Sequence, residues 1–352
     1  MRLWDMVRGW VDQNSASYVY ARLPTGREAT GTDNAALKPN AAYLRLWLSE
    51  LCLGKSVAWG KSWFPVVHAE VRLNLAGRET AMLSKVFRGT SQELGRGVRL
   101  NHPLTDLLPY NGGVVEVEAA LLALQGENYL GTAIGVIQEF SALVGPPLSQ
   151  ALTVSSKVTT GVQELLSATQ GGVHLGFHDA FVSEGGGSAN VLRPGYLAVV
   201  LARPQEVKPD GLEVHSDRLL YGDPPKPLEG YDYLLFRIEG RAERDDWHLP
   251  DIDEPLQEAI IALAQGKRRV GDAYEAAALA AAMRCPEFVS HDRRRVVTAI
   301  KDELASVRRA GFGAVGGGIR PLGAIMEARA MPLRQAAALG APSPEEVFSS
   351  RL

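Results

Sequence analysis

The stretch VVEVEAALLAL, residues 114–124, decides the fold of this chain. Every second residue from Val115 to Ala123 is apolar, which is the period of a β-strand that packs one face on a core. Glu116 and Glu118 lie on the other face, so we expect that face to meet water where the strand begins. The second half of the strand is apolar on both faces and therefore needs a cover.

The segment that follows, residues 128–168, offers such a cover. It holds only three charged residues, and two adjacent prolines divide it into halves that each repeat apolar residues at helical spacing. We predict a helical hairpin, inserted between strands and packed on the apolar end of strand 114–124. Ile137 and Val158 are its predicted interaction residues. Contact with a second chain or insertion into a membrane are the alternatives.

Alternation of apolar and polar residues recurs on both sides of this hairpin. The predicted strands are 43–53, 67–75, 80–87, 173–181, 196–201, 212–215, 218–221 and 231–239. From Asp253 the pattern changes, and the predicted helices are 255–265, 271–284 and 290–309. We therefore predict an α+β fold, with an antiparallel β-sandwich-like part that carries the helical hairpin and with a C-terminal helical part.

Four segments are expected along the chain. They are an N-terminal helix with a loose connection (1–40), a β-rich domain that contains the hairpin (41–250), a helical domain (251–310) and a flexible tail (311–352). Polar and apolar residues alternate in strand 67–75, and we expect the side of the strand that carries the polar residues to be exposed to water.

The N-terminal helix, over residues 3–12, is amphipathic. Trp4 and Trp10 lie on its apolar face and are predicted interaction residues. We expect this helix to dock on the protein's own body or on a partner. A membrane anchor is the competing interpretation, since Trp with flanking Arg suits a bilayer interface.

Composition narrows the class of protein. The chain has 352 residues, 46% of them hydrophobic, and a net charge of −3. A net charge this close to neutral argues against a nucleic-acid partner, because proteins that bind nucleic acids usually carry an excess of basic residues. Its two cysteines lie far apart in the sequence, so a reduced, cytoplasmic setting is expected. We expect neither a signal peptide nor a membrane-spanning helix, because no sufficiently long apolar run is present.

The best candidate metal site is the cluster His174, His178 and Asp179. Imidazole and carboxylate groups are common zinc ligands, and these three fall within a few residues. On a regular strand the two histidines share a face but lie about 13 Å apart. The site would therefore require a bend at Gly176 or a helical turn.

No cofactor is expected. Two Gly-Lys-Ser triplets, at 54–56 and 60–62, lack the preceding glycine and the following helix that a phosphate-binding loop needs. The glycines of 311–316 match a dinucleotide-binding pattern, but too little chain follows them to complete a βαβ unit.

The stretch Phe64-Pro-Val-Val-His-Ala-Glu-Val71 resembles the Pro-x-Val-x-x-x-Val strand of C2-type β-sandwich modules. The resemblance covers about thirty residues and implies a module that binds membranes or protein partners. The Asp that usually precedes this proline is absent, because Phe64 stands before Pro65. The family's calcium ligands therefore cannot be carried over, and a calcium-independent module is implied.

The preferred function is non-enzymatic: a cytoplasmic binding or scaffold protein that docks on a protein partner, on itself or on a membrane surface. One alternative is a metal-dependent hydrolase that uses His174, His178 and Asp179. Another is a defence or toxin-like protein whose low-charge hairpin, 128–168, inserts into membranes.

Overall fold

The computed structural model describes residues 3–23, 35–54, 57–58, 61–74, 80–88, 98–125, 162–164, 166, 172–183 and 190–310. Of the predicted hairpin, only 162–164 and 166 are described, so Ile137 and Val158 lie outside the described residues, as does the predicted tail. Contacts divide the chain into two units. The first comprises Met1–Asp253 with Ala278–Ala299, and the second comprises Glu254–Ala277 with Ile300–Leu352.

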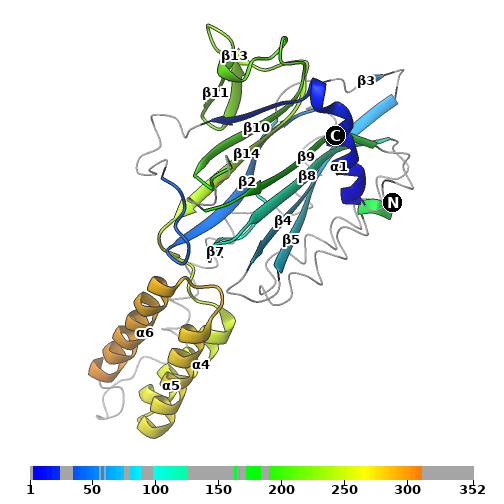
Figure 1. Ribbon diagram of the computed structural model, residues 1–352. Helices are drawn as coiled ribbons and strands as arrows, with labels where there is room; N and C mark the ends of the chain where they lie inside the picture. The colour runs from blue at the N-terminus through cyan, green and yellow to red at the C-terminus, as the bar shows by residue number, and fades with distance from the viewer. Residues whose placement is uncertain are drawn as a thin grey trace, which may run out of the picture. The chain divides into compact units, whose positions relative to one another are not determined.

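The first unit contains two large antiparallel sheets (Figure 1). The large sheet has the order β1 (Val19–Leu23), β10 (Gly195–Leu201), β14 (Asp232–Arg241), β2 (Ala42–Cys52) and β6 (Val98–Pro103), and β7 (Leu108–Tyr110) also pairs with β2. The facing sheet has the order β3 (Val57–Ala58), β4 (Lys61–Asn74), β8 (Val115–Gln125) and β9 (Gly172–Phe181), and β5 (Thr80–Arg88) also pairs with β4.

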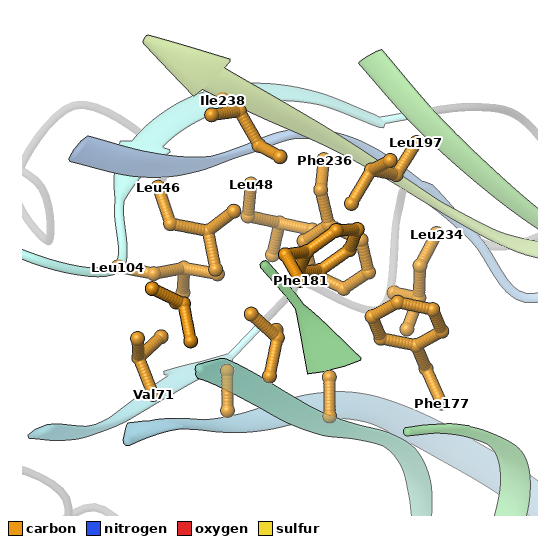
Figure 2. Close-up of a cluster of buried hydrophobic side chains, with 14 of the residues drawn as sticks. Leu46, Leu48, Val71, Leu104, Phe177, Phe181, Leu197, Leu234, Phe236 and Ile238 are labelled. Carbon is orange, nitrogen blue, oxygen red and sulfur yellow. The ribbon is translucent and has the colours of Figure 1, made fainter. Parts of the chain in front are cut away.

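The inner faces of the two sheets meet in one hydrophobic core. Figure 2 shows Leu46, Leu48 and Phe236 of the large sheet pointing toward Val71 and Phe177 of the facing sheet. The rings of Phe177 and Phe236 stack with their centroids 5.6 Å apart. The predicted α+β class with an antiparallel sandwich is therefore confirmed.

A small third sheet covers the outer face of the large sheet. It consists of β11 (Leu212–His215), β12 (Arg218–Tyr221) and β13 (Lys226–Pro227). Leu219 of β12 packs with Tyr233 and Leu235 of β14 in a second hydrophobic cluster. The buried Glu50 carboxylate accepts the backbone N–H of Leu219 at 2.7 Å, which joins the small sheet to β2.

The N-terminal helix α1 (Leu3–Asn14) covers the outer face of the facing sheet (Figure 1). Its buried residues Leu3, Trp4 and Val7 pack on Ala120 and Leu122, the apolar outer positions of β8. Two residues of the 128–168 segment, Val162 and Leu166, belong to the same cluster. Among the described residues, α1 and these two residues cover the apolar outer positions Ala120 and Leu122 of strand 114–124.

The loose connection predicted after the N-terminal helix, within residues 1–40, contains a strand. Val19–Leu23 forms β1, which pairs with β10 at the edge of the large sheet. Val19 and Ala21 are buried and alternate with partly exposed residues. Five residues give only a short period-two pattern beside a Ser- and Gly-rich stretch, so the sequence signal was weak.

Three helices follow the last strand. They are α4 (Pro250–Ala264), α5 (Arg268–Arg284) and α6 (Ser290–Ala310). α4 begins five residues before the predicted start, because Pro250 and the acidic Asp251 and Asp253 all suit a first helical turn. In the second unit, Arg308 bridges Asp272 and Glu275 at 2.7 and 2.5 Å. Among the described residues, no helix has the length and apolar character needed to cross a bilayer.

Candidate functional site

Charged side chains gather on the outer face of the facing sheet, beneath α1. Strand alternation places His68, Glu70 and Arg72 of β4 on one face. Strand register sets Glu70 opposite Glu118 of β8, and Glu118 opposite His178 of β9. We call this surface the polar face; it comprises His68, Glu70, Arg72, Glu116, Glu118 and His178.

Much of the polar face is buried. His68 has no exposed surface, and Glu70 and Glu118 are each 1% exposed. The expectation that water meets Glu118 and the polar residues of strand 67–75 is therefore wrong for Glu118, His68 and Glu70. The amphipathic helix α1 was expected to dock somewhere, but the sequence did not show that it docks on these charges.

α1 supplies two polar contacts to the polar face. The indole Nε1 of Trp4 donates to Oε2 of Glu70 at 2.8 Å, and the Trp4 ring stacks on His68 with centroids 4.9 Å apart. One turn later, Nε of Arg8 donates to Oε1 of Glu118 at 2.8 Å. The helix therefore presents an aromatic donor and a cation four residues apart to carboxylates on neighbouring strands.

Arg72 lies between the same two carboxylates. It is 2.7 Å from Oε1 of Glu70 and 3.0 Å from Oε2 of Glu118. Burial favours the neutral form of Arg72, but the attraction of Glu70 and Glu118 outweighs this effect and raises the pKa of its guanidinium. A third carboxylate, Glu116, is 3.7 Å from Arg72. Among the described side chains of the polar face, three carboxylates thus lie near Arg72, and Arg8 of α1 supplies a second arginine.

The polar face also has a position shaped for close helix approach. Gly176 of β9 is buried under α1. A Cβ at this position would lie 3.1 Å from Cε3 of Trp10 and 3.2 Å from Cγ1 of Val7, closer than side chains normally pack. Gly176 therefore lets α1 lie directly on the backbone of β9.

The structure does not bring His174, His178 and Asp179 together. His174 is the extra residue of a β-bulge, because Val173 pairs with Leu122 and Leu175 pairs with Leu121. The partners of the three candidate ligands also differ. His174 Nδ1 is 3.9 Å from Asp232 Oδ2, His178 Nε2 is 3.8 Å from Glu118 Oε1, and Asp179 Oδ1 accepts from Asn190 Nδ2 at 2.5 Å.

No group of three or more His, Cys, Asp or Glu side chains suited to a metal ion occurs in the part of the chain that the structure describes. The bulge at His174 also removes the regular strand geometry on which the sequence estimate of the histidine separation depended. A bulge of one residue interrupts the strand alternation at a single position, and the sequence alone does not reveal such an interruption.

A second buried polar cluster, in the first unit, joins β2 to the start of α6. Its centre is Asp292, which has no exposed surface and accepts from Tyr43 Oη at 2.7 Å and from Arg295 Nε at 2.5 Å. The backbone N–H of Arg244 donates to the same carboxylate at 3.1 Å. Burial alone would raise the pKa of Asp292, but these hydrogen bonds outweigh it and hold the pKa below its ordinary value.

Comparison with known proteins adds no relative. No protein-family model matches the chain, and no curated protein and no solved structure shows significant similarity to it. The geometry of the polar face and of α1 is therefore the guide to function.

Proposed function

We propose that the chain is a non-enzymatic, cytoplasmic binding or scaffold protein that docks on a protein partner through the polar face. The observation that carries this proposal is the cover itself. α1 lies on the facing sheet, where its Trp4 and Arg8 contact the buried Glu70 and Glu118. None of the described strand pairings includes α1, so all of them can remain when it leaves.

The chemistry of the polar face supports a contact that opens. A helix that never leaves is held most stably by apolar side chains, because burying Glu70 and Glu118 costs desolvation that their ion pairs offset only in part. When α1 leaves, the same carboxylates regain hydration. The apolar outer positions Ala120 and Leu122, which α1 also covers, would then be exposed to water and favour the binding of another helix in its place.

A protein partner fits this surface better than a membrane does. The apolar side chains of α1 that would enter a bilayer, Leu3, Trp4 and Val7, are buried on the protein's own sheet. The described part of the polar face carries the carboxylates of Glu70, Glu116 and Glu118, which repel anionic lipid headgroups. The resemblance of the β4 strand to C2-type modules is compatible with protein binding of this kind.

Two further features support the proposal. Both cysteines, Cys52 and Cys285, are free thiols, as is usual in the reducing cytoplasm. The ionisable groups of the described core also have structural partners, since Glu50, Glu118 and Asp292 each hold two elements together. The hydrolase alternative lacks an assembled centre in the described residues, and no observation favours it.

The test cuts the folded full-length protein between α1 and the sandwich. A protease recognition sequence replaces the short 3-10 turn Ser15–Ser17, and the protein is cut after folding. A fluorescent peptide of residues 1–14 is then added. We expect it to bind the cut protein, measured by fluorescence anisotropy, and not the uncut control.

Two results would overturn the proposal. One is a cut protein that loses its near-UV circular dichroism, since α1 would then be required for the fold. The other is a cut protein that stays folded and retains its own α1 without ever accepting the peptide.

A further inference from the structure

We infer that the polar face selects one class of partner: an amphipathic helix that carries a tryptophan and an arginine four residues apart and displaces α1. This inference rests on the proposed function. It adds the chemistry by which the surface recognises its ligand, with α1 as the bound example.

The spacing follows from the geometry of helix and sheet. Four residues advance a helix by about 6 Å, and neighbouring strands lie about 4.8 Å apart. Glu70 and Glu118 stand directly opposite each other on β4 and β8. A donor and a cation one helical turn apart can therefore each reach one carboxylate, as Trp4 and Arg8 do.

The polar face is selective for arginine because of the geometry with which Arg8 meets Glu118. On the sheet itself, Arg72 lies within 4 Å of Glu70, Glu116 and Glu118. Arg8 approaches Oε1 of Glu118 with two nitrogens, Nε at 2.8 Å and a terminal nitrogen at 2.6 Å. Two guanidinium nitrogens in one plane that converge on this oxygen give a directed contact that the single ammonium group of lysine does not reproduce.

Tryptophan is selected by two contacts at once. Its ring stacks on the buried His68, and its N–H reaches Oε2 of Glu70. Phenylalanine would keep the stacking and lose the donor. Gly176 adds a steric condition, because the ligand helix must lie flat on β9 over this residue.

The test uses the cut protein and four labelled peptides of residues 1–14. They are the natural peptide, the Trp4→Phe and Arg8→Lys peptides, and an Asp12→Asn control altered at an exposed position of α1. We expect Kd to rise about tenfold or more for Trp4→Phe and Arg8→Lys, since each loses a hydrogen bond to a charged group. We expect a change below about twofold for Asp12→Asn.

The protein side supplies a matched pair of variants. Gly176→Val should abolish binding of every peptide by steric exclusion, whereas Val114→Ala, at an exposed position before β8, should leave Kd unchanged. Glu118→Gln should weaken the natural peptide and remove the difference in Kd between the natural peptide and the Arg8→Lys peptide.

Several outcomes would overturn the inference. If the natural peptide binds and Trp4→Phe and Arg8→Lys bind equally well, the polar face is a docking surface without this selectivity, and only the proposed function stands. If the cut protein instead dimerises in sedimentation by exchanging α1, the occupant is a second copy and not a partner helix. Failure of all peptides, including the natural one, contradicts the proposed function itself.

Discussion

At the scale of single residues, buried charges of this protein are organised by hydrogen bonds that cross long stretches of sequence. Trp4 and Glu70 are 66 positions apart, and Tyr43 and Asp292 are 249 positions apart. Neither pair leaves a local pattern, because a strand with alternating polar residues looks the same whether water or a helix covers it. This is why the sequence placed His68 and Glu70 on a strand face but predicted that face to be wet.

Trp4→Phe tests the hydrogen bond to Glu70. The change leaves Oε2 of Glu70 without the indole donor in a buried position, so we expect a loss of about 1–3 kcal/mol in the free energy of unfolding. Urea denaturation measures it. In a double-mutant cycle with Glu70→Leu, the two losses should be non-additive; additivity to within about 0.5 kcal/mol would show that the contact carries no stability.

The buried Asp292 should make the free energy of unfolding depend on pH. Its folded-state pKa lies below that of the unfolded chain, about 3.9 for an aspartate. Its contribution is therefore complete above that unfolded pKa and is lost as the pH falls through the folded pKa. Asp292→Asn should cost about 1.5–3 kcal/mol at pH 7 and should flatten the fall in stability below about pH 4. Equal acid sensitivity in both proteins would exclude this residue as the cause.

At the scale of elements, the docking of α1 depends on the absence of a side chain at Gly176. A methyl group there meets Trp10 and the backbone of Val7. We expect Gly176→Ala to increase hydrogen exchange of the α1 amides while the strand amides of the large sheet stay protected. The matched control is Gly9→Ala within α1, where an added Cβ meets nothing within 4 Å; it should stabilise the helix by about 1 kcal/mol. Unchanged exchange in Gly176→Ala would mean that α1 does not lie closely on β9.

Most elements could be predicted from periodicity, including α1, β2, β4, β8 and the three C-terminal helices. Long patterns with one consistent period carry that information. The short β1 and the bulge at His174 could not be predicted, since each depends on a neighbouring strand. Within the candidate site, Trp4 and His178 were already candidate residues from the sequence. The pairing of Arg8 with Glu118 could not be predicted from it.

At the scale of the whole sandwich, stability depends on the core between the two large sheets. Phe177 is 1% exposed and stacks on Phe236 across the sheets. Phe177→Ala should cost about 3–5 kcal/mol in the free energy of unfolding, measured by urea denaturation. Val114→Ala, at a position 40% exposed, should change it by less than about 0.5 kcal/mol. Similar losses for both would mean that Phe177 is not in a close-packed core.

Native-state hydrogen exchange of the unmodified protein tests most directly whether α1 detaches from a sandwich that is stable without it. We expect the amides of α1 to exchange through a local opening, with a lower opening free energy than the amides of β4, β8 and β14 and with little dependence on denaturant. The opposite result would be α1 amides that exchange only by global unfolding, with the same free energy and denaturant dependence as those strands. In that case α1 would be a fixed part of the fold, and the polar face would not open to a partner.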